Sequence, residues 1–355
     1  MKKLFYVAVF VLLLALVACS GETSTGNNAN TQGQTAEQSG DAKGESGGGE
    51  VKVMKIASTD KPDVAMGRAM FEFERLVEEK SNGAIDVQVF PDSQLGGERD
   101  IIEGIQLGSI QGGPVGVAVT SNFAPKFNLW NLPFLFEDRE TAHRILDGPL
   151  GREVLDSLSE VGIVGINYWE SGIRNLTNNK REIRTPDDLQ GLKIRTLESQ
   201  LQLDMWTTLG ASPEPMAFPE VFTALQQGVI DGQENPFSVI SAAKFYEVQK
   251  YLTVTNHILS LNPFMVSQKF WDTLSDEEKQ IITEAAEEAK VFERTENVKE
   301  NDEYLAFLKE QGMVVAELTP EERQQWVDKV RPVYDKYKNE IGADLVDRLF
   351  QELGN

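Results

Sequence analysis

The chain is poor in the residues that most catalytic and metal sites require. Its 355 residues include one cysteine, Cys19, and two histidines, His143 and His257. A lone thiol excludes a disulfide framework within the chain and a thiolate metal site. No Gly-x-Ser-x-Gly elbow follows a predicted strand, and no His-Glu-x-x-His, Walker or Gly-x-Gly-x-x-Gly motif occurs. We therefore expect no catalytic residues, no metal and no cofactor.

Basic residues are also scarce. The chain has 34 lysines and arginines against 56 acidic residues, and its formal net charge at pH 7 is −22. Nucleic-acid binding needs a clustered positive surface, so this balance argues against it. If the ligand is an anion, a few local cations must overcome an unfavourable long-range field.

Long apolar runs are missing as well, apart from a short one at the N-terminus. Residues 4–18 follow a basic start, and their length is typical of a secretory signal and too short for a membrane-spanning helix. The ending Leu-Val-Ala-Cys at 16–19 resembles a bacterial lipoprotein cleavage box, which implies a signal peptide at 1–19 and a lipid on Cys19. The alternative is an ordinary signal peptide with a chance cysteine. Residues 20–50 lack apolar content and predict a disordered tether, so we expect an extracytoplasmic protein anchored by lipid to the cell membrane.

From residue 51 onward, the hydrophobic pattern alternates between strands and helices. A capping box at Ser275 and Glu278 opens a helical pattern that is far longer than the usual globular helix. Alternating elements predict an α/β fold with two domains and mixed or parallel sheets. Strands are expected at 52–59, 85–89, 162–168, 192–195 and 251–261, and helices at 62–80, 101–107, 198–209, 219–228, 275–311 and from 319 onward.

Three segments between these elements carry candidate ligand-binding residues. Arg174 and Arg195 are each predicted at the end of a strand, where α/β domains bind ligands. A guanidinium group at such a place offers bidentate recognition of a carboxylate. Asn235 precedes a proline that starts a predicted helix and would add an amide contact. The alternative for each arginine is a surface or interdomain salt bridge. The three segments are 168–175, 186–196 and 224–236.

Four sequence motifs, one at 91–96 and three in the second half of the chain, resemble those of one known family. They are similar to the solute-binding proteins of the tripartite ATP-independent periplasmic (TRAP) transporters, the family named for C4-dicarboxylate uptake. The resemblance extends from about residue 51 to the C-terminus. The motifs are Pro-x-Ser-Gln-Leu-Gly at 91–96, Val-Phe-x-Ala-Leu-Gln at 221–226, Asp-Gly-Gln-Glu-Asn-Pro at 231–236 and Lys-Phe-Tyr-Glu-Val at 244–248.

The resemblance implies a periplasmic-binding-protein-like, type II-like flytrap. In such a fold, two α/β domains are joined by crossing strands and a long interdomain helix, and they close on the ligand. The predicted helix at 275–311 fits that long helix. The implied partners are a small organic-acid anion and the TRAP membrane permease subunits, and we expect a monomer. Domain I is expected at 51–171 plus about 261–300, and domain II at 172–260 plus about 301–355.

The resemblance also assigns ligand-binding residues. Family members clamp the substrate carboxylate with the arginine that falls on Arg195, assisted by the arginine and asparagine that fall on Arg174 and Asn235. Phe218 falls where an aromatic residue often lines the cleft. Thr59, at the end of the first predicted strand, is added to the expected set.

The groups that contact the rest of the ligand are less defined by the sequence. Trp169 and Glu170 would suit a hydroxylated sugar ring, by stacking and by hydrogen bonding, or would serve as packing between the domains. A dicarboxylate needs a second cation, for which Arg99 and Lys61 are candidates. The ligand is therefore expected to be a sugar acid such as a uronate, or a C4-dicarboxylate.

Two other functions compete with solute binding for transport. One is a lipid-anchored secreted hydrolase that acts on acidic sugars, since the many carboxylates of the chain would supply an acid–base pair. The other is a receptor that presents its ligand to a sensor kinase instead of a permease. A ligand that is returned chemically unchanged excludes the hydrolase.

Overall fold

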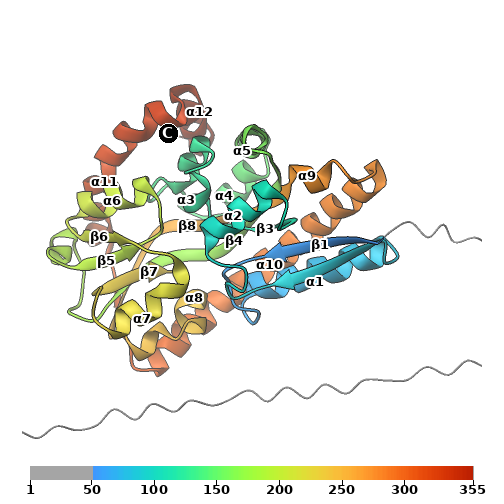
Figure 1. The fold of residues 1–355 in the computed structure, drawn as a ribbon. Coiled ribbons are helices and arrows are strands. Elements are labelled where there is room, and N and C mark those ends of the chain that lie inside the picture. Colours follow the sequence, from blue (N-terminus) through green and yellow to red (C-terminus); the bar gives the residue numbers. More distant parts are fainter. Residues whose placement is uncertain (1–50, 355) are drawn as a thin grey trace, which may run out of the picture. The chain divides into compact units, whose positions relative to one another are not determined.

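Residues 51–354 are described by the computed structural model, and their nine strands join one mixed sheet (Figure 1). The signal peptide predicted at 1–19, with Cys19, and the tether predicted at 20–50 lie outside the described residues. The strands are β1 (Lys52–Ala57), β2 (Ile85–Phe90), β3 (Gly112–Pro114), β4 (Ile163–Asn178), β5 (Lys193–Thr196), β6 (Ser212–Pro215), β7 (Gly232–Asn235), β8 (Tyr251–Ser267) and β9 (Val314–Glu317).

Helices fill the connections between the strands, and the longest begins where its capping box predicts. The Ser275 hydroxyl accepts a hydrogen bond from the Glu278 amide, and the Glu278 carboxylate accepts one from the Ser275 amide. The predicted long helix is confirmed as 35 residues, or about 52 Å at 1.5 Å per residue. The helices are α1 (Ala65–Lys80), α2 (Glu98–Leu107), α3 (Val117–Thr120), α4 (Arg139–Leu146), α5 (Pro149–Asp156), α6 (Gln200–Leu209), α7 (Val221–Gln226), α8 (Phe237–Ala242), α9 (Gln268–Trp271), α10 (Asp276–Glu310), α11 (Pro320–Ile341) and α12 (Ala343–Leu353), with 3₁₀ turns η1 (Pro125–Asn131), η2 (Ser157–Val161), η3 (Pro186–Leu189), η4 (Phe218–Glu220) and η5 (Phe245–Glu247).

The two longest strands, β4 and β8, lie side by side in the middle of the sheet (Figure 1). The order is β2-β1-β3-β8-β4-β7-β5-β6, and β9 pairs with β8 off this path. The outer strands on each side pair in parallel, whereas β8 and β4 pair antiparallel with each other and with their neighbours β3 and β7. The central pair therefore joins two smaller parallel groups of strands.

β4 and β8 are longer than the sequence predicts. They contain 16 and 17 residues, against the 162–168 and 251–261 that alternation indicates. Three register shifts interrupt their pairing, at 165–167, 170–172 and 174–176, and such bulges break the period of two that marks a strand. Segment 168–175 thus lies inside β4, and the expectation that Arg174 stands at the end of a strand is corrected.

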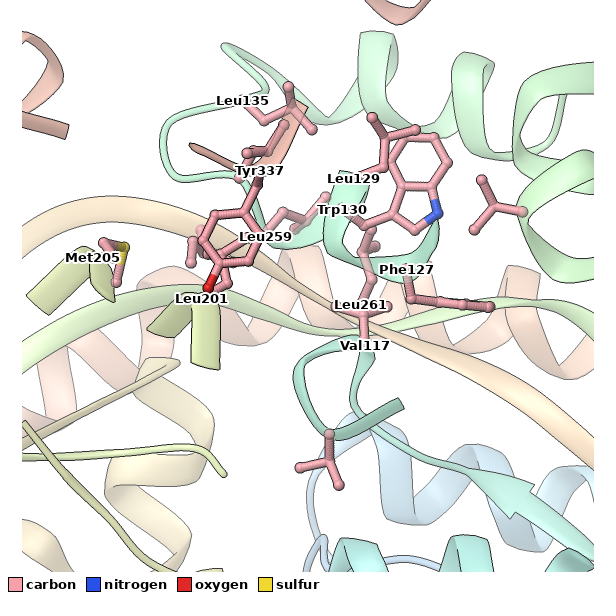
Figure 2. Packing of buried hydrophobic residues seen from close by; sticks show 14 of the residues in the cluster. Val117, Phe127, Leu129, Trp130, Leu135, Leu201, Met205, Leu259, Leu261 and Tyr337 are labelled. Carbon is pink, nitrogen blue, oxygen red and sulfur yellow. The ribbon is translucent and has the colours of Figure 1, made fainter. Parts of the chain in front are cut away.

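Three clusters of buried apolar side chains pack around the sheet. The first surrounds the middle of β8 and includes η1, α6 and α11, and Figure 2 shows part of it. The second packs α1 and the first half of α10 against β1 and β2, and the third packs α7 and α8 against Leu308 near the end of α10. Each fully buried large aliphatic or aromatic side chain contributes roughly 1.5–3 kcal/mol. The members of the first cluster that are labelled in Figure 2 are Val117, Phe127, Leu129, Trp130, Leu135, Leu201, Met205, Leu259, Leu261 and Tyr337.

The α/β architecture is thus confirmed, with one mixed sheet in place of separate ones. The described residues, 51–354, belong to one compact unit, and the division into domains I and II stays a prediction. The second and third clusters lie in the two predicted domains, and α10 contributes to both. No helix between residues 51 and 354 is long and apolar enough to cross a membrane.

Candidate functional site

A cavity lies where the central strands meet the first residues after β1 and the ends of β5 and β7. The volume of this cavity is about 60 Å³, well above the roughly 10–15 Å³ that a single water molecule needs. This volume suits a small molecule. Five of the seven predicted ligand-binding residues line it, namely Thr59, Arg174, Arg195, Phe218 and Asn235.

Strand register brings the three predicted anchoring residues together. β7 lies between β4 and β5, with Asn235 opposite Asn175 and with Gln233 opposite Arg195. Arg174 and Asn235 are 61 positions apart in the sequence, and the sheet brings them together with Arg195. The side chains of Arg174 and Asn235 are in direct contact, because the Arg174 Nη2 donates to the Asn235 Oδ1 at 3.0 Å.

Arg195 is a buried cation with an unused donor. Its side chain is 2% exposed, and its Nε and Nη2 both donate to the carbonyl oxygen of Met216, at 3.0 and 2.7 Å. Its Nη1 has no hydrogen-bond partner among residues 51–354. Burial lowers the pKa of Arg195 to about 10, with the nearby charges of Glu234 and Arg174 acting in opposite directions. The guanidinium group is therefore charged near neutral pH, held rigidly, and able to donate to a carboxylate.

Arg174 is held by a buried carboxylate behind the cavity. The Glu234 carboxylate accepts from the Arg174 Nε at 2.5 Å and from its Nη2 at 2.8 Å, and it also contacts the His257 Nε2 at 3.0 Å. The remaining Arg174 nitrogen, Nη1, donates only to the Ser260 hydroxyl, at 3.2 Å. Arg174 is thus an oriented group whose charge is largely compensated within the protein.

The charge of Glu234 depends on these partners. Burial by itself would raise the pKa of Glu234, but the charge of Arg174 and the hydrogen bonds from His257 and Arg174 outweigh it and hold the pKa at about 2. Glu234 is fully buried, so its charge is stable only while Arg174 and His257 stay in place. The trio therefore fixes the back wall of the cavity.

Phe218 covers the anchoring arginine. Its ring centroid is 6.0 Å from the Arg195 guanidinium carbon, and it packs edge-on against Phe245 at 6.1 Å. A cation near an aromatic face is stabilised by roughly 0.5–2 kcal/mol. Phe218 therefore lines the cavity wall beside Arg195.

The interpretation of Trp169 as a ligand-stacking residue is corrected. Its side chain is fully buried and does not line the cavity. It stacks on Phe264, with ring centroids 4.9 Å apart and an angle of 26° between the planes, within the cluster that packs α1 against α10. Trp169 therefore belongs to the packed core beside the sheet and not to the cavity wall.

Glu170 is likewise placed away from the cavity. It is fully buried and pairs with Arg139 at 3.4 Å and with the His143 Nε2 at 2.8 Å. The Glu170 amide donates to the Glu293 carboxylate of α10 at 3.1 Å. Burial, followed by the charge of Glu170, raises the pKa of Glu293 well above its ordinary value. Glu170 therefore ties β4 to α4 and α10, as the packing alternative expects.

Two carboxyl groups in the cavity wall have no counterpart in the sequence interpretation. Asp60 and Glu98 both line the cavity. Burial raises the pKa of Asp60 despite a hydrogen bond from Ser58 and the charge of Arg174. Burial also raises the pKa of Glu98, against a hydrogen bond from the Gly116 amide at 2.9 Å and the charges of both arginines. Asp60 follows Thr59 at the end of the first strand, so the rule that ligands bind there was sufficient to find it.

Two amides were missed as well, and no sequence signal marks them. Asn131 and Gln202 line the cavity from η1 and α6, and their side chains are 1% and 0% exposed. Neither motif nor periodicity distinguishes an amide that faces a cavity from one on a helix surface. Their positions depend on how η1 and α6 pack over the central strands.

The two candidates for a second cation are placed differently. Lys61 lines the cavity, but its ammonium group pairs with Asp92 at 2.6 Å. Arg99 does not line the cavity, and its nearest carboxylates are those of Glu198 at 3.9 Å and Glu103 at 4.0 Å. In the range 51–354, no group of three histidine, aspartate or glutamate residues is placed to hold a metal ion.

An α/β fold with a small cavity lined by a buried arginine is typical of a binding protein, and comparison with known proteins identifies its family. The chain matches the family of bacterial extracellular solute-binding proteins, family 7, over residues 56–340, and it belongs to that family. It is 35% identical over 303 residues to the C4-dicarboxylate-binding periplasmic protein DctP of Rhodobacter capsulatus, covering 83% of this chain and 89% of the relative.

Two solved structures give the same result. The sugar acid binding protein of Advenella mimigardefordensis, in complex with galactonate, is 38% identical with a TM-score of 0.83, covering 85% of this chain and 98% of that one. A TRAP periplasmic solute-binding protein of Polaromonas sp. JS666, bound to D-erythronate, is 37% identical with a TM-score of 0.81, covering 84% and 98%.

These relatives confirm the resemblance on which the sequence interpretation rests. The chain is a TRAP solute-binding protein, a transport protein and not an enzyme, and it acts outside the cytoplasm. Proteins of this class bind small organic acids and work with membrane permease components. The hydrolase and the sensor-kinase receptor receive no support from these relatives.

Proposed function

We propose that this protein captures a small organic acid by its carboxylate in the cavity at Arg195 and delivers it to the membrane subunits of a TRAP transporter. The observation that carries this proposal is the Arg195 guanidinium group, which is 2% exposed and lines the cavity with an unused Nη1. A buried charged donor without a partner is costly unless a ligand supplies one. Arg174 and Asn235 orient the same carboxylate from the neighbouring strands.

The proposed ligand is a sugar acid or a C4-dicarboxylate. Both kinds occur in the names of relatives, galactonate and erythronate on one side and C4-dicarboxylates on the other. The test is a thermal-shift screen of the purified chain against organic acids. A ligand at 100 times its dissociation constant stabilises the folded state by about 2.7 kcal/mol, and the absence of a shift with every acid of both classes would refute carboxylate capture.

We further propose that Cys19 carries the lipid anchor, on the basis of the cleavage box at 16–19 and the polar stretch that follows. A diacylated cysteine adds about 0.8 kcal/mol of membrane affinity for each buried CH₂ group. Replacing Cys19 with serine should move the protein from the membrane fraction to the soluble extracytoplasmic fraction. Membrane partition that is unchanged by the substitution would contradict the anchor.

Binding is proposed to close the two predicted domains around the ligand. The support is the position of the cavity, whose lining residues come from 59–131, 171 and 261–262 in domain I and from 174–243 and 258–260 in domain II. A hinge closure of this type makes the protein more compact. Small-angle scattering at saturating ligand should therefore give a smaller radius of gyration than the ligand-free protein. Scattering profiles that superimpose with and without ligand would contradict the proposed closure.

A further inference from the structure

Two buried amides in the cavity wall lack the partners that buried amides normally have. Both side-chain atoms of Gln202 and the Nδ2 of Asn131 have no hydrogen-bond partner within residues 51–354. Each buried polar group left unpaired costs about 1–3 kcal/mol, and native proteins rarely leave such groups without a reason. Since both residues line the cavity, a polar group bound there would supply the missing partners.

The kind of partner that they require is set by hydrogen-bond chemistry. The Gln202 Oε1 is an acceptor, and so are the carboxyl oxygens of Asp60 and Glu98 in the same wall. An ionised carboxylate can accept from the two amide nitrogens, but it has no hydrogen to donate, so neither end of a C4-dicarboxylate can satisfy these acceptor oxygens. A hydroxyl group both donates and accepts, and it can bond to an amide oxygen, an amide nitrogen or a carboxylate.

The charged residues that line the cavity also favour a ligand with hydroxyl groups over one with a second carboxylate. Three cations line the cavity, but Arg174 is paired with Glu234 and Lys61 with Asp92. Within the described chain, Arg195 makes no ion pair. A second ligand carboxylate would therefore have no uncompensated cation and would lie near two carboxyl groups of the wall. Like charges that are forced together in a buried site are unfavourable.

We propose that the cavity selects a monocarboxylate that carries several hydroxyl groups, a sugar acid, and rejects C4-dicarboxylates. The two amides Asn131 and Gln202 and the two carboxyls Asp60 and Glu98 are the specificity-determining groups, and they bind the hydroxyls. This inference rests on the proposed carboxylate capture at Arg195. Open-chain and ring forms of sugar acids share this chemistry.

The first test measures affinities of the purified full chain by calorimetric titration with D-gluconate, D-glucuronate and succinate. At least one of the two sugar acids should bind at least ten-fold more tightly than succinate. Which of the two binds more tightly then shows whether the site prefers an open-chain ligand, such as gluconate, or a ring, such as glucuronate. A preference for succinate over both sugar acids would overturn the inference and leave the proposed function standing. Failure to bind all three, and every other acid of both classes in the screen, would overturn both.

The second test replaces Gln202 with leucine, which keeps the size of the side chain and removes both hydrogen-bonding atoms. Affinity for the preferred sugar acid should fall ten-fold or more, while succinate should change less than three-fold. The ligand-free variant should be at least as heat-stable as the wild type, because an unpaired buried amide is removed. Gln200→Leu, on the exposed side of the same helix, is the matched control and should leave all affinities unchanged. Equal losses for sugar acid and succinate would contradict the role of Gln202.

A third measurement tests the repulsion of a second carboxylate. Glu98→Gln removes the ionisable carboxyl group from the wall and keeps an oxygen that can accept from the Gly116 amide. Succinate affinity should rise at least three-fold, and the preference for the sugar acid should narrow. A succinate affinity that stays the same or falls would show that Glu98 does not oppose dicarboxylates.

Discussion

Replacing Arg195 with alanine is expected to weaken binding of the carboxylate ligand by roughly 30-fold to several-thousand-fold. This range corresponds to about 2–5 kcal/mol, the usual effect of removing one partner of a buried charge pair. The effect is large because the chain has a net charge of −22, so that attraction must come from short contacts inside the cavity. Calorimetric titration with the acid found by the screen measures the change.

Two further variants separate an anchoring role from a structural one. Arg195→Lys keeps the charge but loses the planar fork that grips the Met216 carbonyl with two donors, so it should also bind poorly. Arg331→Ala removes an exposed arginine that pairs with Asp328 at 3.2 Å, and it should change stability by about 0–1 kcal/mol and binding not at all. Wild-type affinity in a folded Arg195→Ala protein would refute the assignment.

Replacing Glu234 with glutamine is expected to cost about 3–5 kcal/mol of folding free energy. The substitution leaves the buried charge of Arg174 without its carboxylate, which is the situation in which buried pairs have their largest effects. Denaturant unfolding of the two proteins at pH 7 measures the difference. Glu79→Gln, which removes an exposed partner of Arg75, is the matched control and should cost less than about 1 kcal/mol.

The cost of Glu234→Gln should also depend on pH in a defined direction. The folded-state pKa of Glu234, about 2, lies below its ordinary value of 4.5. The stabilisation by the ionised carboxylate is therefore complete above about pH 4.5 and is lost as the pH falls toward 2. The difference between wild type and variant should shrink by about 3 kcal/mol over that window, at about 1.36 kcal/mol per pKa unit. A difference that is constant from pH 7 to pH 3 would contradict the assigned ion pair.

Local sequence signals predicted the elements that have strong periodicity and caps. The long helix α10 begins at the capping box of Ser275 and Glu278, and α11 begins at the corresponding pair of Thr319 and Glu322. These signals depend on neighbours three or four residues apart, so one sequence is enough to read them. The central strands were underestimated because their bulges interrupt alternation at the residues where β4 crosses the cavity.

The residues of the candidate site also fall into those that the sequence identified and those that it did not. Arg195, Arg174 and Asn235 were found because each combines a suitable side chain with a motif, and the structure brings them to one cavity. Trp169 and Glu170 do not line the cavity, and their contacts with Phe264 and with Arg139 and His143 fit the packing alternative that the sequence left open. Gln202 and Asn131 depend on packing between segments far apart in the chain, which hydrophobic periodicity does not describe.

The pairing of one long helix with two bulged strands has a mechanical consequence. α10 resists bending because each of its turns is fixed by backbone hydrogen bonds over about 52 Å. The strands β4 and β8 lack some of these bonds at their three register shifts, and Gly172 adopts φ +109 beside one of them. Because the long helix α10 is stiff, bending of the molecule should be concentrated at the register shifts of β4 and β8. Because Arg174 pairs at one of these register shifts, a change in backbone geometry there would also move a residue that we propose to bind the ligand.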